Sequence, residues 1–101
     1  MIRREGERML VTGPMTLGHA AELLQQGNEA IGEGARVVDL SGAGELDSSA
    51  LALLLAWRRK ARSASGDLAF DHLPQGLTSI ARLYGVSELL PAGPAADGSH
   101  H

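Results

Sequence analysis

Three consecutive polar residues, Asp47-Ser48-Ser49, are the side chains in this sequence best placed to act at a surface. They follow a glycine-rich turn and precede an apolar run, which is the pattern of residues that begin a helix. Asp47 is expected to accept hydrogen bonds from backbone N–H groups of the first turn, beside two projecting hydroxyls. Helix capping alone would account for this cluster. The same geometry also permits close approach by a partner protein, or addition of a phosphate carrying about −1.5 to −2 charge.

Residue patterns that would indicate catalysis or cofactor binding are missing from the sequence. Asp39, Glu45 and Asp47 could pose as paired acids, but no histidine or nucleophile accompanies them in a catalytic arrangement. The chain has no cysteine, and neither His19 nor His72 has partner ligands at metal spacing. No glycine pair is followed by the Lys-Ser/Thr of a phosphate-binding loop. We therefore expect no enzymatic activity, no cofactor and no metal.

Length and composition suit one small domain with a modest core, since 44% of the 101 residues are hydrophobic. A net charge of −3 and only three aromatic residues argue against a nucleic-acid partner. No apolar run is long enough for a signal peptide or a transmembrane span, so we expect no direct membrane insertion. We assign residues 1–97 to a single domain and ascribe residues 98–101, Gly-Ser-His-His, to an expression tag.

The elements that must position Asp47 alternate between strands and helices, which predicts an α/β layer structure with right-handed crossovers. Segment 35–40 is too apolar for a half-solvated strand, so we place it in the interior of the sheet. Apolar periodicity and turn residues predict strands over 8–12, 35–40 and 68–70, and helices over 17–31, 48–62 and 75–84.

The helix that follows Asp47 is apolar nearly all round. Leu51, Leu54 and Leu55 fall at core spacing, whereas Leu53 and Trp57 lean off that face. Either the helix is wedged between neighbouring helices, or part of it is exposed as an apolar patch with Trp57 as an anchor. The basic residues Arg58, Arg59, Lys60 and Arg62 then suit a solvated helix end, and they could also contact an acidic partner or lipid head groups.

The segment from Val38 to Leu51 resembles the signature of STAS domains. In that family a buried strand ends in Asp-Leu-Ser, and a loop leads to Asp-Ser-Ser-Gly or a variant at the start of the next helix. Both parts occur here at the family's spacing, as Asp-Leu-Ser at 39–41 and Asp-Ser-Ser at 47–49, with Ala50 in place of the glycine. The resemblance implies a small mixed β-sheet with helices packed mainly on one face.

Two branches of the family are relevant to the serines. In anti-sigma factor antagonists the second serine is phosphorylated by a partner kinase, which makes Ser49 the candidate phosphoacceptor. In MlaB-type proteins a hydroxyl residue directly after the aspartate contacts the ATPase subunit MlaF, and Ser48 holds that position. The Leu-Ala-Leu-Leu-Leu run at 51–55, and Ala-Arg-Leu-Tyr at 81–84 with Leu-Pro at 90–91, resemble MlaB sequences.

The MlaB resemblance implies a non-enzymatic accessory subunit that binds and stabilises or regulates the ATPase of a phospholipid-transport ABC complex, which serves outer-membrane lipid asymmetry. The expected partner is an MlaF-like ABC ATPase subunit. The expected location is the cytoplasm, peripheral to the inner membrane through the transporter complex. Asp47, Ser48, Ser49 and Trp57 are the expected partner-binding residues. The alternative is an anti-sigma factor antagonist, a phosphoswitch whose phosphorylatable serine is Ser49.

Overall fold

The computed structural model describes residues 1–93, in which strands and helices alternate after an initial hairpin. The predicted tag, and the last residues of the predicted domain, lie outside this described part. The elements are β1 (Ile2–Glu5), β2 (Arg8–Met15), α1 (Leu17–Gly32), β3 (Val37–Leu46), α2 (Ser48–Ser63), β4 (Ala69–Asp71), α3 (Gln75–Leu83) and a short 3-10 turn (Ser87–Leu89).

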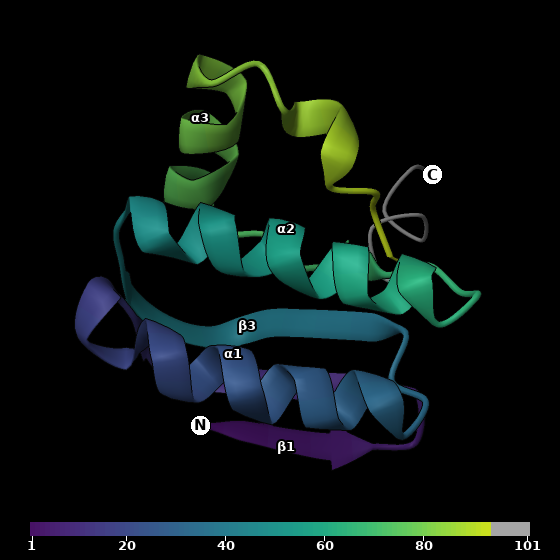
Figure 1. Cartoon of the computed structure of the whole chain (residues 1–101). Helices are drawn as coiled ribbons and strands as arrows, with labels where there is room; N and C mark the ends of the chain where they lie inside the picture. The colour runs from purple at the N-terminus through teal and green to yellow at the C-terminus, as the bar shows by residue number, and fades with distance from the viewer. Residues whose placement is uncertain (94–101) are drawn as a thin grey trace, which may run out of the picture.

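The sheet has the order β1-β2-β3-β4 and is mixed. The hairpin pair β1 and β2 is antiparallel, whereas β2, β3 and β4 run parallel to one another. Helices α1 and α2 lie side by side across one face of the sheet, and α3 packs against α2 (Figure 1). The predicted fold class, a small mixed sheet with its helices mainly on one face, is confirmed. The interior position of the strand that contains Val38 and Leu40 is confirmed as well.

The first strand was not predicted, because Ile-Arg-Arg-Glu has neither a continuous apolar run nor clean alternation. It forms because a tight turn folds it back on β2. Gly6 occupies that turn with a φ of +63°, a conformation that glycine adopts without the Cβ penalty of other residues. The hairpin therefore depends on cross-strand pairing with β2 and on one glycine rather than on the composition of the strand.

The second strand is longer than predicted, since Gly13-Pro14 does not end it. Pairing between β2 and β3 shifts register between Gly13 and Met15, and Pro14 falls within this irregularity. A proline has no N–H to donate, and such a shift is a place where a strand tolerates that loss. β3 is extended in the same way, through the glycine-rich segment to Leu46.

The core lies between the sheet and the helices. Side chains alternate along a strand, so Met9 and Val11 of β2 are buried under the helices while Leu10 lies on the opposite face. Complete or nearly complete burial is shared by Met9, Met15, Leu23, Ile31, Val38, Leu40, Leu54, Trp57, Phe70 and Leu77, among others. The helix layer is thus anchored by fully buried apolar side chains from β2, β3 and β4, and the partly buried Ile2 of β1 packs against the same core.

Trp57 belongs to this core, which contradicts the expectation that it leans off the core face. Its side chain is 0% exposed, and its indole N–H donates a long hydrogen bond of 3.4 Å to the carbonyl of Leu24 on α1. The ring lies against Gly27, where a Cβ would overlap it. Because glycine leaves this space open, the indole fits between the two helices. Leu53 is buried too. Of the two arrangements considered from the sequence, α2 therefore adopts the one in which the helix is wedged between its neighbours and does not expose an apolar patch around Trp57.

On the other face of the sheet, Arg8 joins two aspartates. Its guanidinium lies 3.0 Å from Asp39 Oδ2 and 2.8 Å from Asp71 Oδ2, and Asp71 is fully buried. Burial alone would raise the pKa of Asp39, but hydrogen bonds from Ser41 and the pairing with Arg8 outweigh it and leave this pKa lowered. These charges tie β2, β3 and β4 together on the face that lacks helices.

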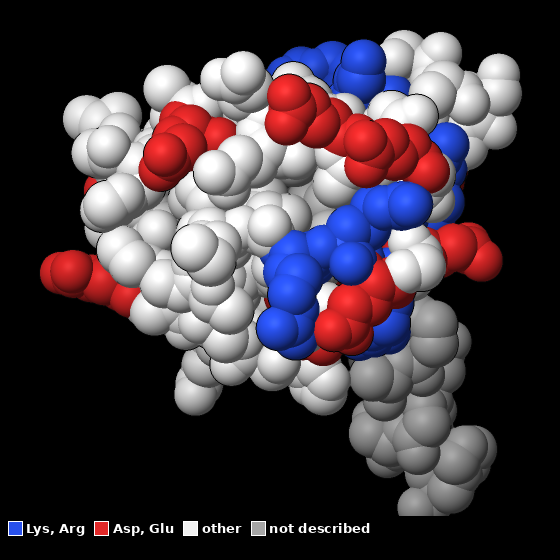
Figure 2. Space-filling model, turned by 90° about the horizontal axis from the view of Figure 1, so that it is seen from below, with Lys and Arg blue, Asp and Glu red and all other residues white. Residues whose placement is uncertain are grey.

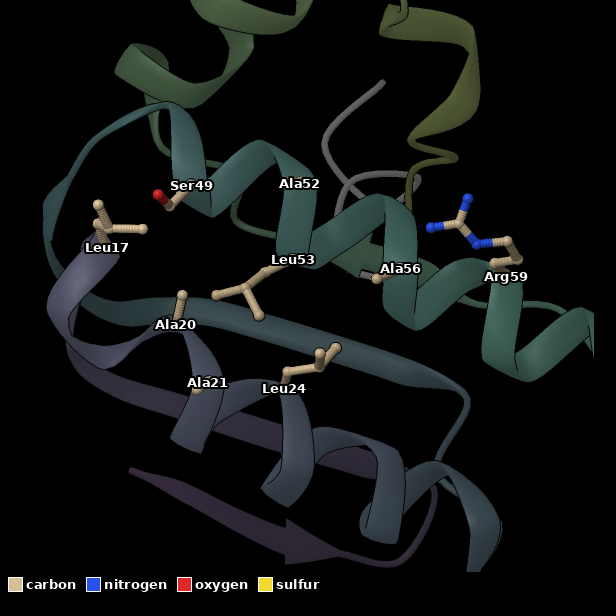
Figure 3. A pocket seen from close by; sticks show the side chains of 9 residues that line it. All are labelled: Leu17, Ala20, Ala21, Leu24, Ser49, Ala52, Leu53, Ala56 and Arg59. Carbon is tan, nitrogen blue, oxygen red and sulfur yellow. The ribbon is translucent and has the colours of Figure 1, made fainter.

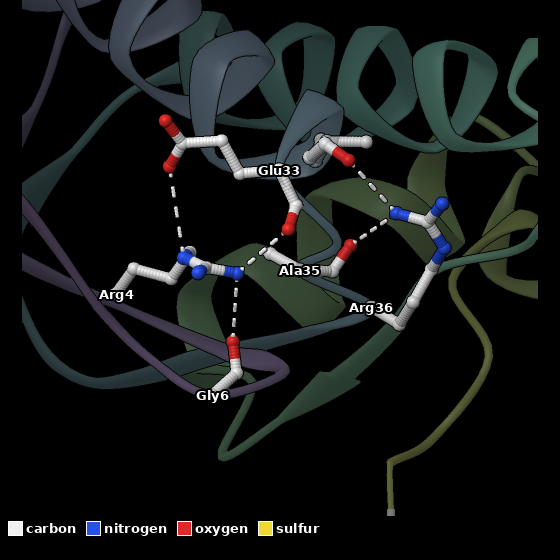
Figure 4. A network of polar contacts seen from close by, with 6 residues as sticks. Arg4, Gly6, Glu33, Ala35 and Arg36 are labelled. Carbon is white, nitrogen blue, oxygen red and sulfur yellow. Dashed lines mark hydrogen bonds and ion pairs between the residues drawn. The ribbon is translucent and has the colours of Figure 1, made fainter.

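Arginine side chains hold the C-terminal end of α1 (Figure 4). Arg4 donates to the carbonyl of Glu33 at 2.9 Å, and Arg36 donates to those of Ile31 and Ala35 at 2.9 and 2.6 Å. Carbonyls at the end of a helix lack intrahelical donors, so Arg4 supplies a donor to the Glu33 carbonyl. Arg36 adds a second donor to the Ile31 carbonyl, which already accepts from the Gly34 N–H at 3.0 Å. The end of α1 is thereby fixed over the β1–β2 hairpin.

The face seen in Figure 2 carries both acidic and basic side chains; β1 contributes Arg3 and Arg4, whereas α1 has acidic residues but no Lys or Arg. Two ion pairs there are exposed, Arg3 with Glu5 at 3.0 Å and Arg4 with Glu33 at 3.7 Å. Exposed pairs of this kind contribute little to stability. Neither sign dominates the charged part of this face, in keeping with the modest net charge of −3.

After α3 the chain returns to the outer edge of β4. The Phe70 N–H donates to the carbonyl of Pro91 at 2.8 Å, and the Gly93 N–H donates to the carbonyl of Phe70 at 3.0 Å. Ala92 and Phe70 form a parallel bridge, and Leu90 is buried. Residues 90–93 therefore cover the side of β4 that faces away from β3.

Candidate functional site

The start of α2 is built around Asp47, which connects two helices. Asp47 Oδ1 accepts a hydrogen bond from the Ser49 N–H at 2.8 Å, so the predicted cap is confirmed. Asp47 Oδ2 accepts a hydrogen bond at 3.0 Å from the N–H of Leu17, the first residue of α1. The Leu17 hydrogen bond is the main cause that lowers the pKa of Asp47. Burial opposes it, and hydrogen bonds from Ser49 add to the lowering. One ionised carboxylate thus holds the first turns of both helices.

The two serines are placed differently. Ser48 is exposed at the first position of α2, and Ser49 is half-buried with its side chain on the side of α1. Small side chains at the first turn of a helix leave backbone N–H groups and the positive end of the helix dipole accessible. The structure therefore brings Asp47, Ser48 and Ser49 together at one surface, and it places Trp57 away from that surface, in the core.

A groove begins at Ser49 and runs between α1 and α2 (Figure 3). Its volume is about 540 Å³. Four alanines line much of it, so the two helices leave a hollow between their outer faces instead of interlocking side chains. Its lining consists of Leu17, Ala20, Ala21 and Leu24 from α1, and Ser49, Ala52, Leu53, Ala56 and Arg59 from α2.

The groove continues along α1, where a second hollow shares Ala21 and Leu24 with the first. Lys60 of α2 and Glu29 of α1 line this continuation. The groove was not predicted from the sequence, although alanines recur on both helices. Spacing along one helix does not reveal which face of a second helix lies beside it.

Residues 1–93 contain neither a membrane-spanning helix nor a metal-binding cluster. No helix there is long and apolar enough to cross a membrane. Within the same residues, no group of three or more histidine, cysteine or acidic side chains could hold a metal ion. Asp39 is engaged by Arg8 on the helix-free face, whereas Asp47 caps α2, so these carboxylates do not form the acid pair considered from the sequence.

Comparison with known protein families assigns this chain to one family. The family model described as "Mlab, STAS domain" matches residues 1–91. The chain belongs to the STAS domain family. No curated protein matches the chain in sequence.

Solved structures share the STAS fold over most of the chain. The phosphorylated Bacillus cell fate determinant SpoIIAA superposes with a TM-score of 0.66 at 12% identity, covering 97% of this chain and 94% of that one. An anti-sigma-factor antagonist (STAS) domain protein from Planctomyces limnophilus gives 0.69 at 15% identity, covering 96% and 92%. A sulfate transporter family protein from Wolinella succinogenes gives 0.63 at 17% identity, covering 89% and 75%. The fold thus occurs both in anti-sigma factor antagonists and in a transporter family.

Proposed function

We propose that this STAS domain is a non-enzymatic accessory subunit that binds and stabilises or regulates the cytoplasmic ATPase of a phospholipid-transport ABC complex. The observation that carries the proposal is the match to the MlaB-described STAS family over residues 1–91. The proposed partner is an MlaF-like ABC ATPase subunit, which would hold the domain at the cytoplasmic side of the inner membrane. Asp47, Ser48 and Ser49 are the proposed contact residues.

The start of α2 has the physical properties that such a contact needs. Ser48 is exposed and small, so a partner can approach the first turn closely. Asp47 is already engaged by two backbone N–H groups, so the turn is held in place before any partner arrives. A rigid contact surface loses little conformational freedom on binding. A subunit of this kind regulates without chemistry of its own, by binding one conformation of the ATPase more tightly than another.

Substitution of Ser48 tests this proposal. Ser48→Arg should change the free energy of unfolding by only about 0.5 kcal/mol, because the position is exposed. It should weaken binding of the ATPase by about 2 kcal/mol, roughly thirtyfold in Kd, because an unpaired charge would enter a desolvated contact. Ser48→Ala should be milder. Binding is measured by titration with a purified MlaF-like ABC ATPase subunit from the same organism, and folding by thermal melts.

Ser63→Arg is the matched control, since Ser63 is an exposed serine at the opposite end of the same helix. It should bind the ATPase as the wild type does. If Ser48→Arg melts normally and also binds like the wild type, the start of α2 is not the contact surface.

An anti-sigma factor antagonist is the second candidate, favoured by the fold shared with SpoIIAA. In that case a serine kinase, not an ATPase of a transporter, would co-purify with the chain, and mass spectrometry would find phosphate on Ser49. Ser49 is half-buried beside α1, whereas Ser48 is exposed, so a kinase would have to reach the less accessible hydroxyl.

A further inference from the structure

The groove between α1 and α2 carries charged side chains that form no ion pair within residues 1–93. Arg59 lines the apolar part of the groove, and no ion pair or hydrogen bond of its side chain occurs there. Its neighbour Arg58 differs, since it pairs with Asp67 at 2.9 Å. Lys60 and Glu29 line the continuation of the groove and are also without an ion pair in the described residues. The α2 side of the groove is therefore basic, and its α1 side carries an acid.

Apolar surface is exposed beside these charges. Leu17 stands at one end of the groove with 75% of its surface accessible, next to Asp47 and the start of α2. From Leu17 to Glu29 the groove follows α1 for about 18 Å, at 1.5 Å of helical rise per residue. That length accommodates about three turns of another helix.

We propose that this groove binds an amphipathic α-helix of the ATPase partner, with its apolar face between α1 and α2 and an aspartate or glutamate opposite Arg59. The inference rests on the proposed function and specifies the partner segment. The proposal is supported by charge complementarity between the groove and an acidic partner helix, because the unpaired cations Arg59 and Lys60 lie along the α2 side of the apolar groove. Between two helices only side chains are offered, so an incoming strand would gain no ladder hydrogen bonds. A helix with apolar residues at i, i+3 or i+4 and i+7 fits such a floor.

Charge reversal on α2 provides the first test. Arg59→Glu should raise the Kd for the purified ATPase at least tenfold, because it places like charges opposite each other. Arg62→Glu is the matched control on the same helix, exposed and outside the groove, and should change the Kd less than threefold. Thermal melts of both variants show whether folding is intact. Equal Kd values for Arg59→Glu and Arg62→Glu would overturn the proposal.

Photo-crosslinking identifies the bound segment. The probe is p-benzoylphenylalanine in place of Ala52, an exposed residue of the groove, with the same substitution at Ala64, exposed beyond the end of α2, as the control. Crosslinks from position 52 should map to a helical ATPase peptide with an acidic residue beside an apolar stripe. A crosslink to a second copy of this chain, or to a basic or extended ATPase segment, would refute the inference.

Titration of the wild type separates the two proposals. If the wild type binds the ATPase but Arg59→Glu binds as well as Arg62→Glu, the groove proposal fails and the accessory function stands. If the wild type does not bind the ATPase at all, both fail.

Discussion

Gly27 should be the residue that sets the spacing between α1 and α2. A Cβ at position 27 would overlap the indole ring of Trp57, lying 2.7 Å from Cζ2 and closer still to two other ring atoms. The ring is rigid and fully buried, so it has no free space into which it can turn. Gly27→Ala would gain about 1 kcal/mol from helix propensity but lose about 2–3 kcal/mol from overpacking, the upper part of the usual range, because the added Cβ would overlap a rigid ring. We expect a net loss of about 1–2 kcal/mol, which lowers Tm by roughly 4–15 °C in a domain of this size.

The assay is thermal and urea unfolding of matched variants. Gly18→Ala is the control, because Gly18 lies in the same helix and a Cβ there meets no atom within 4 Å. It should leave stability unchanged or raised. In a Trp57→Phe background the smaller ring should relieve the overlap, so Gly27→Ala should cost less there than in the wild type. A Gly27→Ala variant that melts at or above the wild type would refute this account of the helix contact.

Two further predictions concern substitutions at ion pairs. The hydrogen bond from Arg58 lowers the pKa of Asp67 from 3.8 to about 2, so the stability that this carboxylate contributes is present above its unfolded pKa and is lost as pH falls from about 4 to 2. Asp67→Asn should flatten the dependence of unfolding free energy on pH in that window, and an unchanged slope would contradict the assignment. Arg8→Met should destabilise by about 3 kcal/mol in urea unfolding, because Arg8 pairs with the buried Asp71, whereas Arg3→Met at an exposed pair should cost under about 1 kcal/mol. Equal losses in the two variants would show that burial of the pair is unimportant.

Local signals predicted the elements around Asp47 closely. The helix expected over 48–62 is Ser48–Ser63, and the one expected over 75–84 is Gln75–Leu83. Capping residues and apolar periodicity act within a few residues, so one sequence contains them fully. Tyr84 shows the limit of local signals, since the expected helix included it but it lies beyond the helix end and is exposed.

Features that depend on contacts between distant segments were not predictable in the same way. Trp57 was misplaced because helical periodicity describes a helix against one layer, whereas α2 contacts both α1 and α3. The hydrogen bond from the Leu17 N–H to Asp47 joins residues 30 positions apart. The groove likewise depends on how α1 packs beside α2. The cap on α2 could be predicted from the sequence, but its second role at α1 could not.

The outer strands restrict how this domain can associate with other proteins. On one side, residues 90–93 already occupy the edge of β4 through hydrogen bonds to Phe70. On the other, β1 is only four residues long and carries three charged side chains, which disfavours pairing with a further strand. Growth of the sheet into fibres or strand-swapped dimers is therefore suppressed at both ends. Recognition is left to side chains, so a partner must match surface shape and charge and cannot bind simply by extending the backbone ladder.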